Sequence, residues 1–329
     1  MGPEVLSDIL SDIKHIPDEN LILGFDSSDD AAVYRIIDDL CAIHTLDFFP
    51  PIMDDPYEFG AVAAANSLSD IYAMGGTPIS ALNILCIPGD FDHDQITKRI
   101  LEGGADKAAE AGINISGGHT LEDHEPKYGL SVVGIARERD IVKNKGAEPG
   151  DVLVLTKPLG SGVLTTADKA GMLSPQEHKT LHGILSALNR WPAEQIKGLA
   201  VSAGTDITGF GLMGHGAEVA DASDVTLHLY ARSLPLMDGA DELAKDGIIP
   251  AGAYKNRGFL KGRYRTDKNV PRHIEDIAFD PQTSGGLLYS LKTAEAVTYL
   301  KRCKEVGLNA WIIGEVKERE DVSIRLLFE

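Results

Sequence analysis

Residues 56–78 read PYEFGAVAAANSLSDIYAMGGTP, a run of small and apolar residues interrupted by a few polar ones. Pro56 suits the first turn of a helix, and the glycines at 75 and 76 are typical of a helix end, so we predict a helix from Pro56 to about Met74. At about 100° per residue, Asn66 and Asp70 lie one above the other within a stripe of small apolar residues. The stretch therefore predicts a helix that carries an amide and a carboxylate on its inward face.

This pair has two interpretations. A carboxylate on an inward face is costly unless a cation or hydrogen-bond donors offset its charge, which favours a ligand site at Asp70. The alternative is a solvated pair on an exposed face. Because apolar residues flank Asn66 and Asp70 on both sides, the ligand interpretation is the stronger one.

Strand and helix patterns alternate on both sides of this helix. Before it, a helix is expected at 3–14, and a polar loop at 24–30 leads to two strands that form a hairpin. After it come a strand, an amphipathic helix and two more strands, with a loop at 117–127 between the last two. The expected strands are 31–36, 40–46, 79–87, 113–116 and 128–136, and the expected amphipathic helix is 96–111.

The turn EPGD at 148–151 precedes a second series of strands and helices. A chain of 329 residues is long for one core, so we predict two domains, residues 1–150 and 151–329, of the α/β (α+β) class. Residues 252–272 are polar and basic with little periodicity, and we expect a long surface loop there. The expected helices of the second half are 161–170, 175–189, 212–222, 238–246 and 293–306, and its strands are 152–155, 225–229, 287–291, 310–313 and 323–327.

The composition excludes several classes of partner. The net charge is -19, from 31 Lys and Arg against 50 Asp and Glu, and such a surface repels nucleic acid and anionic membranes. No apolar run approaches the roughly 18 residues of a membrane helix, and residues 1–4 lack the features of a signal peptide. Three separated cysteines, Cys41, Cys86 and Cys303, indicate a reducing compartment and structural thiols. We therefore expect a cytoplasmic protein.

Further aspartates stand where ligand groups are common in α/β proteins. Asp29 and Asp30 come directly before an apolar strand, where the plain alternative is a turn residue. Asp47 ends the next strand, and a strand terminator and a ligand are equally good interpretations. Asp206 lies in GTDITGFGL at 204–212, a glycine- and hydroxyl-rich turn that leads into a helix. It is either a helix cap or a metal ligand.

Together, Asp30, Asp47, Asp70 and Asp206 offer only oxygen ligands, which favours Mg²⁺ over zinc or copper. A second glycine turn, GGHT at 117–120, offers backbone amides and a hydroxyl but is a weak signal by itself. The sequence contains no Walker A motif. A nucleotide site here would therefore use metal ions to bridge carboxylates and phosphates.

Six segments resemble motifs of the selenophosphate synthetases, in that family's order: DDAAVY at 29–34, TLDFFPPIMDDPYEFG at 45–60, AAANSLSDIYAMGGTP at 63–78, TKPLGSGVLTTA at 156–167, TDITGFGLMGH at 205–215 and DPQTSGGLL at 280–288. The first and third are shared loosely with aminoimidazole ribonucleotide synthetases, thiamine-monophosphate kinases and hydrogenase-maturation dehydratases. The last three are far more specific. The resemblance implies two α/β domains and a homodimer whose N-terminal domains join into a barrel. It also implies that selenide, ATP and water react to give selenophosphate, AMP and phosphate.

Position by position, the resemblance implies Mg²⁺ ligands at Asp30, Asp47, Asp70 and Asp206. It implies nucleotide contacts at Ser27, Ser28, Asp29, Asp47, Asn66, Asp70, Gly118, His119 and Thr120, with the last three reaching the site of the other subunit. The implied small-molecule ligands are thus ATP, Mg²⁺ and selenide, and the implied partner is a second copy of the chain.

The reactive residues of that family have no counterpart in this sequence. Its members carry a reactive Cys or selenocysteine and a Lys in a glycine-rich segment, and residues 2–6 resemble the helix that follows it. The resemblance therefore implies that this Cys or selenocysteine and this Lys would lie upstream of Met1. We expect the chain, as a truncated form or a short paralogue, to bind Mg-ATP but to turn over weakly with selenide.

Other interpretations stay open. The chain could be a sister enzyme such as a thiamine-monophosphate kinase, or a non-catalytic nucleotide-binding paralogue. The roles of His119, His215 and the loop 282–284 stay unassigned, with an ordinary helix residue as the default for His215.

Overall fold

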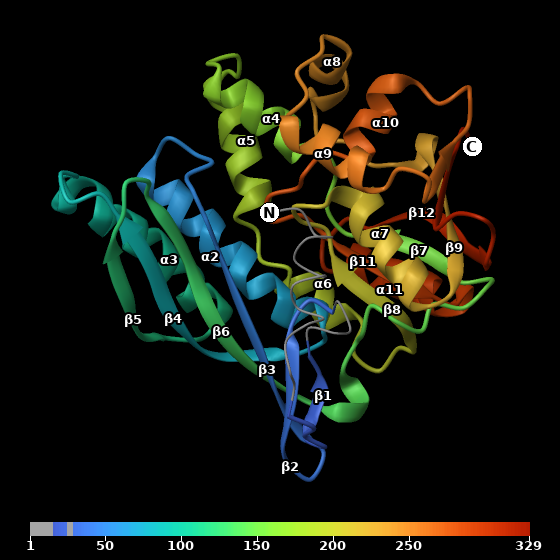
Figure 1. Cartoon of the computed structure of the whole chain (residues 1–329), viewed down its shortest axis with the longest axis horizontal. Coiled ribbons are helices and arrows are strands. Elements are labelled where there is room, and N and C mark those ends of the chain that lie inside the picture. The colour runs from blue at the N-terminus through green and yellow to red at the C-terminus, as the bar shows by residue number, and fades with distance from the viewer. Residues whose placement is uncertain (1–15, 25–28) are drawn as a thin grey trace.

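The computed structural model describes residues 16–24 and 29–329, which form two mixed α/β bodies lying side by side (Figure 1). The first contains a sheet in the strand order β1-β2-β3-β6-β4-β5, and the second a sheet in the order β10-β13-β9-β12-β7-β11-β8. The expected α/β (α+β) class with two bodies is confirmed. Met1, the helix expected at 3–14 and the residues Ser27 and Ser28 lie outside the described residues.

The first sheet is largely antiparallel, and only β4 and β5 pair in parallel. Helices α2 (Pro56–Ala73) and α3 (Lys98–Ala111) pack on one face of it, and a π-helical turn (His93–Thr97) leads into α3 (Figure 1). Its strands are β1 (Leu21–Leu23), β2 (Ala32–Ile37), β3 (Leu40–Phe49), β4 (Thr77–Ile87), β5 (Ile115–Glu122) and β6 (Lys127–Arg137).

Helix α2 forms as the sequence predicts. The Asp55 side chain caps its start by accepting hydrogen bonds from two backbone amides of the first turn, and Gly75, with a φ of 73°, follows its end. A Cβ at Gly60 would lie 2.0 Å from the Ile100 carbonyl oxygen of α3, so glycine is needed for the two helices to approach this closely. Of the 18 residues of α2, nearly all are buried, including Asn66. The helix is therefore the centre of the first body.

The second sheet mixes parallel and antiparallel pairs. Its strands are β7 (Val152–Leu155), β8 (Val201–Asp206), β9 (Val225–Tyr230), β10 (Tyr264–Thr266), β11 (Leu287–Leu291), β12 (Trp311–Glu318) and β13 (Ile324–Leu327). Helices surround it: α4 (Ser161–Lys169), α5 (Pro175–Leu185), α6 (Arg190–Gln195), α7 (Gly211–Ala222), α8 (Ala240–Lys245), α9 (Ala251–Phe259), α10 (Arg272–Ala278) and α11 (Thr293–Glu305). Short 3-10 turns occupy Glu138–Asp140 and Ala231–Ser233.

Strands β7 and β11 lie inside this sheet with both faces covered. Val154 and Tyr289 belong to the apolar cluster that continues into the first body, whereas Leu153 and Leu288 belong to a cluster on the other face. Burial on both faces explains why these strands are continuous apolar runs rather than alternating ones. The first sheet ends at Arg137 and the second begins at Val152, and the domain division near residue 150 stays a prediction.

Two predicted loops are wrong. Residues 117–127 do not form a loop throughout, because β5 runs to Glu122 as the edge strand of the first sheet. Gly118 has a φ of 154°, and a Cβ there would lie 2.3 Å from the Asn83 carbonyl oxygen on β4, so its glycine serves close strand pairing rather than a turn. Residues 252–272 contain α9, β10 and the start of α10 instead of one long loop.

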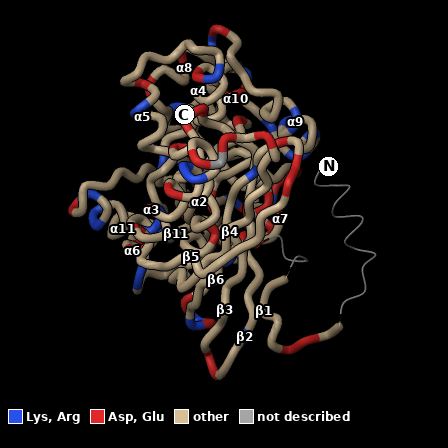
Figure 2. The backbone as a smooth tube through the Cα atoms, turned by 90° about the vertical axis from the view of Figure 1, so that its left-hand side faces the viewer, with Lys and Arg blue, Asp and Glu red and all other residues tan. Residues whose placement is uncertain are grey.

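The sequence also missed strand β8, and the helix expected at 175–189 is divided between α5 and α6. Cys41, Cys86 and Cys303 are buried and unpaired. Within the described ranges, no helix combines the length and the apolar character needed to cross a membrane. Acidic and basic positions are interspersed over both bodies, with acidic residues at the turn between β2 and β3 (Figure 2).

Candidate functional site

Four aspartates meet where the two bodies join. Asp30 precedes β2, Asp47 lies near the end of β3, Asp70 lies in the last turns of α2, and Asp206 ends β8 of the second sheet. Each carboxylate accepts a hydrogen bond from an uncharged side chain: Thr205 Oγ1 to Asp30 (2.6 Å), Asn66 Nδ2 to Asp47, Thr45 Oγ1 to Asp70, and Ser69 Oγ to Asp206 (2.5 Å). The structure therefore brings together all four aspartates that the sequence singled out, together with Asn66.

Electrostatics oppose the ionised form of every carboxylate in this cluster. Burial, and then the negative charge of Asp206, hold the pKa values of Asp30 and Asp70 well above the usual range. The same two causes raise the pKa of Asp47 to about 6, and burial raises the pKa of Asp206 itself. Asp206 is almost fully buried, whereas the other three keep part of their surface open. A cation at this cluster would relieve both the desolvation and the mutual repulsion.

The cluster is not a closed metal cage. Among the described residues, no three His, Cys, Asp or Glu side chains converge on one point closely enough to hold a metal ion by themselves. A metal bound by these aspartates would take its remaining ligands from water or from another molecule, as Mg²⁺ commonly does with phosphate oxygens. The donor set, carboxylates and hydroxyls, contains only the hard oxygen ligands that this ion prefers.

The loop 280–286 closes the site from the second body. The Ser284 amide donates to Asn66 Oδ1 at 2.9 Å, and Asn66 in turn donates to Asp47. Ser284 has a φ of 49°, an unfavourable conformation for a residue other than glycine, so the surrounding contacts must hold it in place. The loop thereby fixes the amide that orients Asp47.

Lys157 makes one of those contacts. Its ammonium is buried and donates to the carbonyl oxygens of Ser284 and Ala187, both at 2.7 Å. Burial lowers the pKa of Lys157 to about 7, and the negative charge of Asp206 opposes that shift. A buried lysine with two carbonyl partners therefore ties the loop to the second sheet.

Asp280 and Gln282 connect this loop to the start of α4. Asp280 accepts hydrogen bonds from the Gly162 and Val163 amides, and Gln282 Oε1 accepts from the Gly160 and Ser161 amides, so the loop caps a helix that lacks its own side-chain cap. Burial raises the pKa of Asp280 to about 7. The motifs TKPLGSG and DPQTSGG, far apart in the sequence, thus form one structural unit.

A cavity of about 420 Å³ adjoins the cluster and is formed by both bodies. Its lining combines polar and apolar residues. The polar ones include Asp47, Asn66, Thr208, His215, Gln282 and Thr283, and the apolar ones include Phe49, Ile52 and Phe210.

The remaining predicted positions lie elsewhere. Asp29 accepts a hydrogen bond from the Asn144 amide at 2.8 Å, and it anchors the segment between the sheets. Gly118, His119 and Thr120 lie on β5, three strands from β3 or roughly 14 Å away, and the structure does not bring them to the four aspartates. The turn predicted at 117–120 is therefore corrected to an exposed edge strand.

The prediction about the reactive Cys or selenocysteine and Lys is not tested by this structure. It places both residues upstream of Met1, and Met1 itself lies outside the described residues, which begin at Ile16. The prediction therefore stays a prediction.

Asp206 does not cap α7. The helix begins after Phe210 and has no side-chain hydrogen bond at its cap, so the capping alternative is wrong. Asp206 instead accepts from Ser69, and the Asn189 amide bridges Ser69 to the Gly285 carbonyl with distances of 2.9 and 2.8 Å.

Sequence reasoning missed the residues that support the aspartates: Thr45, Lys157, Asn189 and Thr205. Each is a polar residue within or beside an apolar stretch, which is the signal that could have identified them. Their partners are distant in the sequence, with 175 residues between Thr205 and Asp30.

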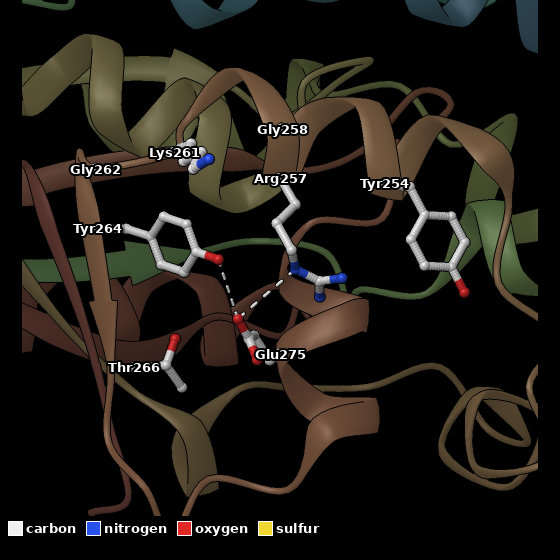
Figure 3. A pocket seen from close by; sticks show the side chains of 8 residues that line it. All are labelled: Tyr254, Arg257, Gly258, Lys261, Gly262, Tyr264, Thr266 and Glu275. Carbon is white, nitrogen blue, oxygen red and sulfur yellow. Dashed lines mark hydrogen bonds and ion pairs between the residues drawn. The ribbon is translucent and has the colours of Figure 1, made fainter.

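A second cavity, of about 560 Å³, lies between α9, β10 and α10 and contains none of the predicted site residues (Figure 3). Two of its polar side chains interact with Glu275, which accepts a hydrogen bond from the Tyr264 hydroxyl at 3.4 Å and lies 3.7 Å from Arg257 Nε. Lys261 stands apart from that group at the rim. The cavity holds no cluster of unpaired acids comparable to the one where the bodies join.

Comparison with known proteins identifies the fold. The sequence profile described as "AIR synthase related protein, N-terminal domain" matches residues 28–136, and that described as "AIR synthase related protein, C-terminal domain" matches residues 148–326. A solved structure described as "AaThiL complexed with AMPPCP and TMP" superposes with a TM-score of 0.70 over 98% of this chain and 91% of that one, at 18% identity. At that identity the likeness concerns the fold alone.

Curated relatives are much more similar. A protein named "Selenide, water dikinase" from Clostridium botulinum (strain Eklund 17B / Type B) is 48% identical over 98% of this chain and 94% of its own length. "Selenide, water dikinase 2" from Peptoclostridium acidaminophilum is 49% identical over 98% of this chain and 93% of its own length. Such identity along nearly the whole of each chain places the protein by its sequence: it belongs to the selenide, water dikinase family, within the fold of the AIR synthase-related proteins.

Proposed function

We propose that this protein makes selenophosphate from selenide, ATP and water and releases AMP and phosphate. The observation that carries the proposal is the cluster of Asp30, Asp47, Asp70 and Asp206, which both bodies build and which is intact in a chain 48% identical to a named selenide, water dikinase. Four buried carboxylates with raised pKa values, three of them raised in part by the charge of Asp206, are costly to a fold and are typical of a functional site.

ATP and Mg²⁺ are the ligands that fit the cluster. The fold relative described above was solved with AMPPCP, a methylene analogue of ATP. The four aspartates would hold Mg²⁺, and Asp29, Asn66 and the residues around them would contact the nucleotide, together with Ser27 and Ser28, which lie outside the described residues. When bound, Mg²⁺ would neutralise the triphosphate and the charge that develops as the γ-phosphoryl group leaves.

The protein's own contribution is orientation. Asn66 fixes Asp47, and the Ser284 amide fixes Asn66, so a backbone group of the second body sets the position of an acid in the first. Ser69 and Thr205 hold Asp206 and Asp30 in the same way. Such preorganised geometry supplies much of the rate enhancement in phosphoryl transfer, because the transition state needs positioning more than covalent help.

A homodimer also belongs to this proposal. The face of the first sheet opposite α2 exposes large apolar side chains, which monomeric surfaces rarely gather: Tyr34, Ile36, Leu46, Phe48, Ile79, Leu82 and Leu121. A second copy joined through this face would cover them and would bring Gly118, His119 and Thr120 toward the partner's site. The cytoplasmic location, suggested by the buried, unpaired cysteines, stays a prediction as well.

The test is a product analysis with selenide, ATP and Mg²⁺. We expect AMP and phosphate in equal amounts and in step with selenophosphate. ADP as the final product, with an organic acceptor phosphorylated, would instead support a sister kinase such as a thiamine-monophosphate kinase. ATP binding without turnover would support a non-catalytic paralogue. The rate itself tests the expectation that this chain turns over weakly with selenide.

A further inference from the structure

A hydroxyl, an imidazole and a carboxylate form a hydrogen-bonded series at the start of α7. Thr208 Oγ1 lies 3.1 Å from His215 Nε2, and His215 Nδ1 lies 3.0 Å from Glu218 Oε2. His215 and Glu218 are three residues apart on the helix, whereas Thr208 belongs to the preceding loop. When Glu218 accepts a hydrogen bond from Nδ1, the neutral imidazole has Nε2 free to accept one from the Thr208 hydroxyl. In this arrangement a carboxylate supports an imidazole, and the imidazole can take a proton from a hydroxyl oxygen.

This series ends in the cavity beside the acid cluster. Thr208 and His215 line the same cavity as Asp47 and Asn66. The backbone fixes Thr208 firmly, because its carbonyl oxygen accepts from both the Gln282 and the Gly211 amides at 2.9 Å. The backbone of Thr208 is therefore held in place at the cavity where the nucleotide phosphates would lie under the proposed function, and its hydroxyl lies beside His215.

The surroundings make His215 a good proton acceptor. Its side chain is mostly buried, and the Phe210 ring covers it with a centroid distance of 5.4 Å. Burial opposes protonation, but the hydrogen bond and charge of Glu218, and then the charge of Asp206, outweigh it, so the pKa of His215 lies above its ordinary value.

We infer that Thr208, His215 and Glu218 form a proton relay that activates the water consumed in the second half of the reaction. The inference rests on the proposed function, in which ATP loses its γ-phosphoryl group to selenide and leaves a diphosphate. The water oxygen forms a bond to the β-phosphorus, and the bridging P–O bond breaks, with its electron pair remaining on AMP. The water proton passes to Thr208 Oγ1 as the hydroxyl proton of Thr208 passes to His215 Nε2, and from there to solvent.

The plain alternative is a structural role in which His215 only ties the loop to the helix. The chain offers a matched control for that role. His228 is also mostly buried and also paired with a glutamate, Glu320 at 2.7 Å, but it lies on β9 outside the cavity. Removing His228 should cost a similar amount of stability and should leave the reaction products unchanged.

The first experiment measures the ratio of ADP to AMP in single-turnover reactions of the full chain with selenide, Mg²⁺ and ATP. The His215→Gln, Glu218→Gln and Thr208→Val variants should accumulate ADP, with the step from ADP to AMP slowed by about 100-fold for His215→Gln, the usual size of a lost general base. Thr208→Ser keeps the hydroxyl and should restore AMP formation. An unchanged ratio in His215→Gln, or the same change in His228→Gln, overturns the relay.

The second experiment does not need turnover. Mg-ADP is added while the histidine ring signals are followed by NMR, with His228 as the internal reference. We expect the His215 signals to move on binding, and to move much less in Thr208→Val. If Mg-ADP binds and His215 does not respond, the relay is wrong and the proposed function stands. If no nucleotide binds, the proposed function fails and the relay with it.

Discussion

In the second sheet, side chains cover both faces of β7 and β11, whereas in the first sheet only the face under α2 and α3 is covered. The bare face carries apolar residues such as Leu46 and Phe48, at 57% and 40% exposure. The second sheet is covered within one chain, whereas the bare face of the first sheet is where the proposed dimer would form. The two bodies therefore differ in how much of their apolar sheet surface the chain itself buries.

Buried carboxylates also differ between the second body and the cluster where the bodies join. In the second body, Asp151 is fully buried but paired, because Lys292 Nζ lies 2.8 Å from it and the Ser290 hydroxyl donates at 2.9 Å. Burial tends to raise its pKa, yet these hydrogen bonds outweigh burial and the pKa of Asp151 is lowered. In the cluster where the bodies join, the pKa of Asp70 moves in the opposite direction. Asp151 is thus paired with a cation, whereas the aspartates of the cluster are held by uncharged donors.

The largest expected effect comes from replacing Asp70 and Asp151 by asparagine in separate variants. Asp70→Asn should reduce ATP turnover by at least about 100-fold, the usual loss when a charge-stabilising group is removed, while stability rises because a repelling charge is gone. Asp151→Asn should leave turnover nearly unchanged and lower the free energy of unfolding by about 2 kcal/mol, because hydrogen bonds to a charged group are lost. Urea unfolding and initial rates on both variants check this. Stability changes of equal size and sign in Asp70→Asn and Asp151→Asn would contradict the difference between the two acids.

The next effect concerns the bare face. Phe48→Glu places a charge among the exposed apolar side chains and should weaken a dimer by about 100-fold or more, since burying an unpaired charge is costly. Val297→Glu is the matched control, because Val297 is 59% exposed on α11 of the second body. Light scattering coupled to gel filtration should show a monomer for the first variant and the wild-type mass for the second. Wild-type protein that is monomeric at every concentration would refute the dimer.

The smallest effect tests a contact that joins the two bodies. His178 Nε2 lies 2.7 Å from Glu58 Oε2 of α2, and His178 Nδ1 lies 2.9 Å from Asp168 Oδ2 of α4, with His182 nearby at 3.9 Å from Glu58. Burial opposes protonation, but the hydrogen bonds to Asp168 and Glu58 outweigh it and raise the pKa of His178.

A raised pKa in the folded state means that the protonated imidazole stabilises the fold. That contribution is fully present below the unfolded pKa of about 6.5 and is lost as pH rises through the folded pKa. His178→Gln should therefore lower the free energy of unfolding by about 1 kcal/mol near pH 6 and by clearly less near pH 8.5. A double-mutant cycle with Glu58→Gln, by urea unfolding at both pH values, measures the coupling. A loss that grows with pH contradicts this sign.

Local pattern predicted much of this architecture. The strands 152–155 and 287–291 have the predicted bounds, because a short apolar run bounded by turns is typical of a doubly covered strand. The inward position of Asn66 on α2 follows from helical periodicity. The strand expected at 113–116 covers only the start of β5, and the rest was predicted as a loop, because nearly all of β5 is exposed and its sequence shows no alternation of apolar and polar residues.

The four aspartates and Asn66 could be named from the sequence, but the other groups that orient the aspartates could not. The contacts of Lys157 with Ser284 and of Ser284 with Asn66 span 127 and 218 residues, and no local pattern records a contact at that range. The Thr208–His215–Glu218 series was equally hidden, since His215 had an ordinary helix position as its default. Tertiary packing decides which polar residues in apolar surroundings become neighbours.

The hydrogen bond from Ser284 to Asn66 also bears on the timing of biosynthesis. The 218 residues between them take about 10–40 s to translate at roughly 5–20 residues per second. Throughout that interval helix α2 can exist while the loop that fixes its amide has not yet been made. A nascent chain therefore contains three of the four aspartates long before it contains the loop that orients Asn66. The site is completed near the end of synthesis, when the second body docks.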